Sequence, residues 1–376
     1  MVHGEFQPAF GPLRDLLARN LEDGSDLGAS LAVIHDDELV VDLWGGEARP
    51  GVPWQQDTVV QVWSVTKSMV GLAALVLADR GELDLDAPVA TYWPEFGANG
   101  KDGVLVRQLL GHTSGVPGWS QQISVEECLD LVAAETLLAA ERPWYAPGSA
   151  PAYQILAHGH LVDGLVRGAT GRGVAEVLRD DVLAPLGADF LLGVPEAELG
   201  RCADLTSPPA STIDPKKLPP DAFILRTIAN PLLTPKRCNE DDWRQGQVGG
   251  AGGHGNARGL ARAQALVSHG GEVGGVRLLS KETVDRIFET QAEGIDQVLM
   301  LPVRWGIGFA LPAAGAPAIA DREIAWWTGY GGAIVVNDAA TRTTIAYTPN
   351  RLVEHLMSSP RTDAYVRTAF DCLEAL

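Results

Sequence analysis

Strand-like segments stand at both ends of this 376-residue chain, and their distribution limits the possible folds more than any other feature. Residues 29–46 (ASLAVIHDDELVVDLWGG) hold two apolar runs around Asp36-Asp37, a pattern that predicts a β-hairpin. Three further stretches have the composition of strands, RWGIGFAL, AWWTGYGGAIVVND and TRTTIAYTPN, at residues 304–311, 325–338 and 341–350. We therefore expect both ends of the chain to form one antiparallel sheet.

Helices are predicted next to these strands and between them. Apolar residues at helical spacing predict an amphipathic helix over residues 10–23, and residues 362–376 predict another. From about residue 64 to 300, helical patterns alternate with Gly/Pro-rich loops, among which residues 205–221 are too Pro-rich for regular structure. The pattern predicts an α/β chain with two lobes. Residues 1–60 and 300–376 form the α/β lobe, and residues 61–299 form an inserted, mostly helical lobe.

The composition excludes several function classes. The net charge is −19 and no Lys/Arg cluster offsets it, which disfavours nucleic acids and anionic membranes as partners. The N-terminus has no basic segment followed by an apolar run, and no stretch is long and apolar enough to span a bilayer. The four cysteines are scattered without a Cys-x-x-Cys pair, as expected of isolated thiols in a reducing compartment. We expect a cytoplasmic protein, and the sequence leaves its oligomeric state open.

The most unusual local feature is the stretch SVTK, Ser64 to Lys67, at the start of an apolar helical pattern that ends near Gly81. Three residues apart, Ser64 and Lys67 share one face of a helix. A serine at a helix start lies beside free N–H groups, and a desolvated lysine can accept its proton. The alternative is that Ser64 only caps the helix while Lys67 extends to solvent.

Two later stretches bear on this choice. Tyr153 directly precedes an apolar helical run that ends at Gly168 or Gly171. Residues 325–332 (AWWTGYGG) read as a strand with glycines in its middle, and such glycines often mark close approach by a ligand or another backbone.

Together these stretches resemble the serine β-lactamase and penicillin-binding-protein family, over nearly the whole chain. The nearest branch is the class C β-lactamase-like esterases, or family VIII carboxylesterases. Ser64-Val65-Thr66-Lys67 matches the family's Ser-x-x-Lys motif, and Tyr153 matches the tyrosine of its second motif. Trp327-Thr328-Gly329 stands where relatives have Lys-Thr-Gly, His-x-Gly or, in esterases, Trp-x-Gly. Residues 109–117 (LLGHTSGVP) and 249–271 resemble further family segments.

The resemblance implies a β-lactamase-like fold and a role for each motif residue. Ser64 is the expected nucleophile. Lys67 is expected to hydrogen-bond both Ser64 and Tyr153, whose phenol, acidified by the ammonium, serves as general base. Whether Lys67 or Tyr153 takes the first proton is left open. The backbone N–H groups of Ser64 and Tyr330 are the expected oxyanion hole.

Two departures from the family pattern favour esters as substrates. Trp327 replaces a cationic residue that grips a substrate carboxylate, and its bulk suits a neutral group, although simple core packing is the alternative. Ile155 replaces the expected Asn after Tyr153, so an amide for an acylamino side chain is missing unless Gln154 supplies it. Thr328 and Gly329 complete the expected pocket, with loops at 118–123 and 205–245 as its outer walls.

Other patterns carry less weight. Residues 250–255 fit Gly-x-Gly-x-x-Gly but no buried strand precedes them, so no nucleotide site is expected. His158 and His160 point to different faces of a helix and have no third ligand, and His112 is expected to be a hydrogen-bonded turn residue. No cofactor or metal is expected.

The predicted function is a serine carboxylesterase acting on small esters. The alternatives are a β-lactamase, D-amino-acid peptidase, amidase or transacylase with the same nucleophile, or a non-catalytic binding protein.

Overall fold

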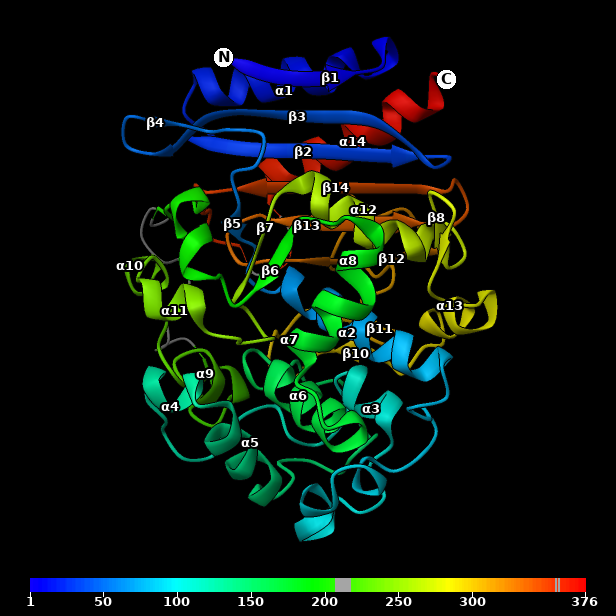
Figure 1. Cartoon of the computed structure of the whole chain (residues 1–376). Helices are drawn as coiled ribbons and strands as arrows, with labels where there is room; N and C mark the ends of the chain where they lie inside the picture. The colour runs from blue at the N-terminus through cyan, green and yellow to red at the C-terminus, as the bar shows by residue number, and fades with distance from the viewer. Residues whose placement is uncertain (207–217, 356, 358) are drawn as a thin grey trace.

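A computed structural model describes residues 1–206, 218–355, 357 and 359–376 of the chain. In this part of the chain one antiparallel sheet has the strand order β1-β3-β2-β14-β13-β12, with β4 added to β3 (Figure 1). The strands are β1 (Val2–Phe6), β2 (Gly28–His35), β3 (Glu38–Arg49), β4 (Val52–Pro53), β12 (Ile324–Thr328), β13 (Ile334–Asp338) and β14 (Thr343–Pro349). The pairing of β2 with β14 joins the two ends of the chain, and it confirms the prediction of a shared sheet.

The hairpin between β2 and β3 turns at Asp36 and Asp37, as predicted. Both have positive φ angles, 46° and 67°. Aspartate tolerates this region better than most residues, and a two-residue turn of this kind follows the right-handed twist of the strands.

Two of the predicted C-terminal strands differ from expectation. The stretch 325–338 is two strands, because β12 ends at Thr328 and the chain turns back through Gly331 and Gly332, whose φ angles are 90° and 117°. The stretch 304–311 yields only the end of β11 (Pro302–Trp305), which pairs with β10 (Ala292–Ile295). Isolated bridges at Ala310 connect this hairpin to β12.

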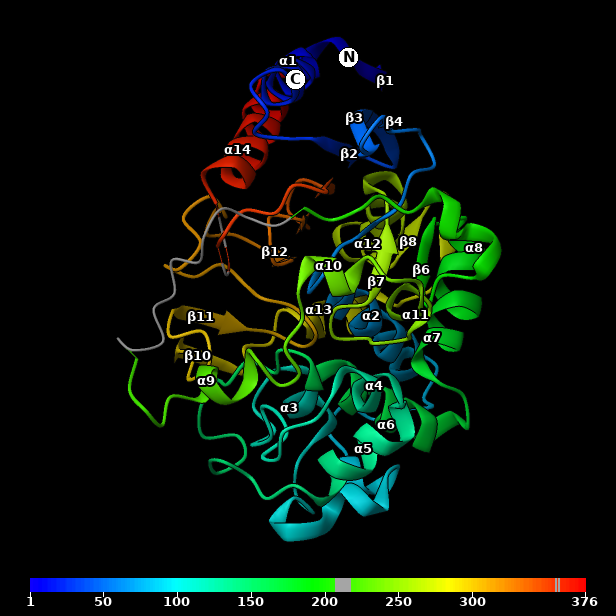
Figure 2. The ribbon, with the colours of Figure 1, turned by 90° about the vertical axis from the view of Figure 1, so that its left-hand side faces the viewer.

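Helices cover both faces of the sheet (Figures 1 and 2). The predicted terminal helices α1 (Gly11–Glu22) and α14 (Pro360–Glu374) pack together on one face. On the other face lies α12 (Ala257–Ser268), which contacts β2, β13 and β14. The division of the chain near residues 60 and 300 remains a prediction, and α12 shows that a helix from the inserted segment also packs on the sheet.

A mostly helical layer of the chain lies below the sheet in Figure 1. Its central helix is α2 (Val65–Asp79), which is buried almost along its length and packs against α6 (Ala157–Thr170). The remaining helices are α3 (Val106–Leu110), α4 (Val125–Leu129), α5 (Leu131–Ala140), α7 (Val174–Val177), α8 (Ala184–Leu186), α9 (Phe223–Thr227), α10 (Pro235–Cys238), α11 (Asp241–Gln245) and α13 (Lys281–Ile287). The hairpin strands β8 and β9 are Glu272–Val273 and Val276–Arg277.

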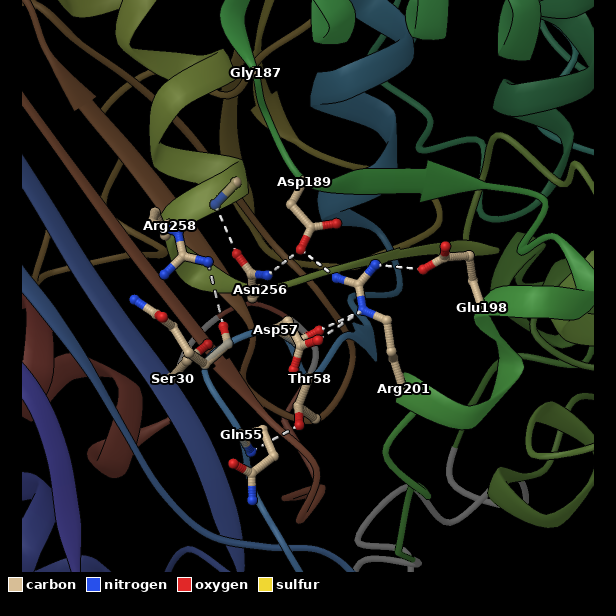
Figure 3. Close-up of polar contacts among 12 residues, drawn as sticks. Ser30, Gln55, Asp57, Thr58, Gly187, Asp189, Glu198, Arg201, Asn256 and Arg258 are labelled. Atoms are coloured by element: carbon tan, nitrogen blue, oxygen red, sulfur yellow. Dashed lines mark hydrogen bonds and ion pairs between the residues drawn. The ribbon is translucent and has the colours of Figure 1, made fainter.

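A second, small sheet has the strand order β5 (Val60–Gln61), β7 (Gly253–Gly255) and β6 (Phe190–Leu192). Figure 3 shows the polar network at its ends. The guanidinium of Arg201 donates to Asp189 before β6, to the carbonyl of Asp57 before β5 at 2.8 Å, and to Glu198 at 2.6 Å. Asn256, directly after β7, donates to Asp189 at 2.8 Å. One network therefore connects the ends of all three strands.

Two other expectations concern the chain as a whole. All four cysteines are buried and carry free thiols, in agreement with the absence of a disulfide framework. Across the described ranges, no helix is both long and apolar enough to cross a membrane. Most of the Pro-rich stretch 205–221 lies outside the described residues, and with it part of the expected pocket wall at 205–245.

Candidate active site

Ser64 lies at the N-terminal end of α2, directly after Trp63. The Trp63 backbone has a φ of 49°, which is uncommon for a non-glycine residue and turns the chain sharply between β5 and the helix. The Ser64 side chain makes no capping hydrogen bond to the helix. The alternative role of Ser64 as a helix cap is therefore wrong, and its hydroxyl is available for chemistry.

Lys67 is buried, with only 2% of its surface exposed. Its Nζ lies 3.0 Å from Ser64 Oγ, 2.6 Å from the carbonyl oxygen of Ile155 and 2.7 Å from that of Gly250. Burial lowers the pKa of the Lys67 amine well below its usual value, because the site holds the charged form away from water. Lys67 thus does not extend to solvent, and its amine is aimed at the Ser64 hydroxyl.

Tyr153 lies on the other side of Ser64. Its hydroxyl accepts a hydrogen bond from the indole Nε1 of Trp327 at 3.0 Å and is also a hydrogen-bond partner of the Ser64 side chain. Lys67 Nζ lies 4.8 Å from the centre of the Tyr153 ring. The expected hydrogen bond from Lys67 to the Tyr153 hydroxyl is absent among the described contacts, and a cation–π arrangement replaces it.

The electrostatics of Tyr153 also differ from expectation. Burial raises the pKa of Tyr153 above its usual value, and its hydrogen bonds with Ser64 and Trp327 only partly oppose this. The prediction that a nearby ammonium acidifies the phenol is therefore wrong. The desolvated phenol is neutral at ordinary pH, so it can donate a proton before it can accept one.

The third motif approaches the nucleophile through Gly329, directly after β12. A Cβ atom added to Gly329 would lie 2.1 Å from the carbonyl oxygen of Val62, so only glycine lets this strand end lie against the segment that leads into Ser64. Within the described ranges, neither the Ser64 N–H nor the Tyr330 N–H donates to another protein group. Both donors are thus free, as an oxyanion hole requires.

The remaining predicted pocket residues take different positions. Trp327 and Thr328 are buried on β12. Gln154 turns away from the site, because its amide hydrogen-bonds Ser114 at 2.7 Å and its carbonyl oxygen lies 3.1 Å from His112 Nδ1. Its side chain is fully paired inside the protein, so the idea that it replaces the missing Asn is wrong.

Ile155 contributes its backbone carbonyl to Lys67, a role that the sequence did not indicate. His112 is a hydrogen-bonded turn residue with a φ of 57°, as predicted. Two more residues near Tyr153 carried no sequence signal. Asp296 accepts the Tyr153 N–H at 3.0 Å, and Trp305 stacks on the Tyr153 ring, with ring centres 5.6 Å apart and planes 7° from parallel.

Comparison with known proteins identifies the family. The sequence profile of the β-lactamase family matches residues 13–369. The chain belongs to the β-lactamase family. The resemblance drawn from the motifs and the predicted fold are thereby confirmed.

Individual relatives are similar over most of their length. The esterase/β-lactamase LipL of Mycobacterium tuberculosis is 33% identical over 350 residues, which cover 88% of this chain and 78% of LipL. The crystal structure of a family VIII carboxylesterase superimposes with a TM-score of 0.92 at 32% identity, covering 99% of this chain and 100% of that one. A penicillin-binding-protein homologue from Caulobacter crescentus gives a TM-score of 0.90 at 30% identity, with coverage of 99% and 100%. Two of these three proteins are named as esterases, which supports the expectation of a serine carboxylesterase.

Proposed function

We propose that this protein is a serine carboxylesterase that cleaves small esters through an acyl-enzyme on Ser64. The observation that carries the proposal is the environment of the Lys67 amine. A neutral amine has two N–H donors and one lone pair. The carbonyls of Ile155 and Gly250, at 2.6 and 2.7 Å, take the two N–H groups, which leaves the lone pair facing Ser64 Oγ at 3.0 Å.

This arrangement favours Lys67 as the first base. Burial favours the neutral amine and the protonated Tyr153 phenol, since it lowers the pKa of Lys67 and raises that of Tyr153. Lys67 then takes the Ser64 proton as the serine oxygen attacks the ester carbonyl. The negative charge that develops on the carbonyl oxygen is stabilised by the N–H groups of Ser64 and Tyr330.

Tyr153 completes the proton route. As the tetrahedral intermediate collapses, the Tyr153 hydroxyl protonates the departing alkoxide, while the Lys67 ammonium beside its ring keeps the Ser64 proton and offsets the charge of the phenolate. In the second half-reaction water takes the place of the alcohol. The same transfers in reverse release the carboxylic acid and restore the Ser64 hydroxyl.

The substrate class follows from the third motif. Trp327 carries no charge, and its one donor group is engaged by Tyr153. The site therefore offers no cation at this position for the carboxylate that penicillins and peptide termini carry. A neutral small ester fits this position better, and the names of two relatives agree with that choice.

A substrate panel tests this assignment. Hydrolysis of p-nitrophenyl butyrate is compared with that of nitrocefin and of a D-Ala-D-Ala peptide, and a fluorophosphonate probe reports whether Ser64 is reactive. We expect Ser64 labelling and a kcat/KM for the ester above those for the other two. Faster turnover of the lactam or the peptide would replace the ester assignment, and a folded protein whose Ser64 stays unlabelled would favour a non-catalytic role.

A further inference from the structure

A buried carboxylate stands behind the proposed proton-transfer tyrosine. Asp296, directly after β10, has no exposed surface. Its Oδ1 accepts backbone N–H groups from Tyr153 at 3.0 Å and from Val298 and Leu299 at 2.9 Å each. Its Oδ2 accepts the indole N–H of Trp305 at 3.1 Å.

In the described part of the chain, the hydrogen-bond donors to Asp296 are all neutral N–H groups. Among the described residues, the ion pairs include no cation at Asp296. Burial raises the pKa of the Asp296 carboxyl, while the four N–H donors oppose this effect. Four donors converging on two oxygens suit an ionised carboxylate, which only accepts hydrogen bonds.

Two of the groups that donate to Asp296 belong to Tyr153 or pack against its ring. The first is the backbone of Tyr153 itself. The second is Trp305, whose ring stacks almost parallel to that of Tyr153 and meets Trp327 edge-on, with ring centres 4.7 Å apart. Trp327 in turn donates to the Tyr153 hydroxyl. Asp296 thus connects the backbone, the ring face and, through the two tryptophans, the hydroxyl of Tyr153.

We propose that Asp296 is a positioning residue for Tyr153, which fixes the phenol in line to protonate the leaving group. The proposal rests on the proposed function, since it assigns Asp296 to the leaving-group step of that reaction. The charge acts in the same direction as the geometry: after burial, the Asp296 carboxylate is a further cause that raises the pKa of Tyr153 and keeps the phenol protonated.

A leaving-group comparison separates this role from general structural support. Ethyl butyrate releases an alkoxide that needs a proton, whereas p-nitrophenyl butyrate releases a stable phenolate that needs little help. A defect that acts through Tyr153 therefore slows the ethyl ester more. A defect that merely loosens the fold slows both esters by the same factor.

The principal variant is Asp296→Asn combined with Trp305→Phe. In Asp296→Asn alone, the new amide N–H would face the indole N–H of Trp305, and two donors cannot hydrogen-bond each other. Trp305→Phe removes the indole N–H, so the double variant loses the carboxylate charge without this clash. The second variant is Trp305→Leu, which removes the stacked ring and leaves the three backbone donors of Asp296 in place. The matched control is Asp163→Asn, because Asp163 is also buried and accepts a backbone N–H, that of Val174, while its other oxygen accepts from Arg167 and not from a residue beside the Tyr153 ring.

We expect the double variant to lower kcat for ethyl butyrate by about 10-fold more than kcat for p-nitrophenyl butyrate, which is part of the roughly 10²- to 10⁴-fold that general-acid catalysis contributes. Trp305→Leu is expected to shift the ratio in the same direction, and Asp163→Asn to leave it unchanged. If the double variant does not fold, Trp305→Leu decides alone.

An unchanged ratio in the folded variants would overturn the role of Asp296 while leaving the esterase intact. If the unaltered protein hydrolyses neither ester, the proposed function itself fails, and the role of Asp296 falls with it.

Discussion

The indole N–H of Trp327 donates to the hydroxyl of Tyr153 at 3.0 Å, so a side chain of the third motif holds the tyrosine of the second. In relatives with Lys-Thr-Gly this position carries a cation. Here it carries a neutral donor that is directed at the proton-transfer machinery. Trp327 therefore supports Tyr153 directly, and under the proposed function the missing cation also disfavours substrates with a carboxylate at this position.

Trp327→Phe keeps the ring and removes this donor. The loss of one buried hydrogen bond predicts a fall in kcat of about 2- to 10-fold, with a larger effect on ethyl than on p-nitrophenyl esters. Trp326→Phe is the control, because Trp326 is the buried neighbour on the same strand and its indole donates to the Leu311 carbonyl instead. Equal effects of the two substitutions would argue against a specific role for the Trp327 donor.

Gly329→Ala tests the close approach behind the oxyanion hole. The added methyl group would lie 2.1 Å from the Val62 carbonyl oxygen and must push the strand end away from Ser64. Loss of one oxyanion donor predicts a fall in kcat of about 10²-fold or more. Gly103→Ala, where an added Cβ meets nothing within 4 Å, is expected to be neutral. A Gly329→Ala enzyme of normal activity would mean that Tyr330 is not an oxyanion donor.

The lowered pKa of Lys67 predicts the pH profile. An amine whose pKa lies below the ordinary value of 10.5 loses its proton at a lower pH than other lysines do, so the neutral base is available at a pH where an ordinary lysine is still charged. Activity should fall as the pH drops through the lowered pKa, and kcat/KM measured against pH reports this acid limb. A limb near 10.5 would contradict a neutral Lys67.

Two substitutions distinguish the role of Lys67 as a base from the general effect of removing a buried lysine. Lys67→Ala should remove about 10³-fold or more of the activity while the protein stays folded. Lys101→Met is the matched control, because Lys101 is also buried and donates to three carbonyl oxygens, but outside the site. It should change the melting temperature and leave the acid limb where it is.

The network at Arg201 predicts an effect on stability. Arg201→Ala removes hydrogen bonds to three acidic or carbonyl partners at the ends of the small sheet, and we expect a loss of about 1–3 kcal/mol in the free energy of unfolding. Urea unfolding measures it. Arg179→Ala, which breaks an exposed pair with neighbouring Asp180, should leave the midpoint unchanged. Equal midpoints for both variants would mean that the network adds no stability.

The parts of the site that could be predicted from the sequence are those with a local pattern. The hairpin at Asp36-Asp37 and the terminal helices follow from periodicity and turn chemistry. Ser64 and Lys67 lie one helical turn apart, so their proximity follows from spacing alone. The sequence predicts strand interior at Gly331 and Gly332, where the structure has a turn, because glycines within an apolar run permit both interpretations.

The remaining contacts join residues that are far apart in the chain. Trp327 and Tyr153 are separated by 174 residues, and Asp296 and Tyr153 by 143. The carbonyls that bind Lys67 come from backbone, which carries no residue-type signal. Burial also reversed the expected pKa shift of Tyr153, and burial of a single phenol depends on packing that no local pattern encodes.

The most direct test of the central claim is the location of the acyl group during turnover. The enzyme is mixed with p-nitrophenyl butyrate, quenched in acid within the first turnover and digested, and the acylated peptide is identified by mass spectrometry. The account predicts a butyryl group on Ser64, and none on a Ser64→Ala enzyme treated in the same way. A butyryl group on another residue, or ester turnover that persists in Ser64→Ala, would contradict it.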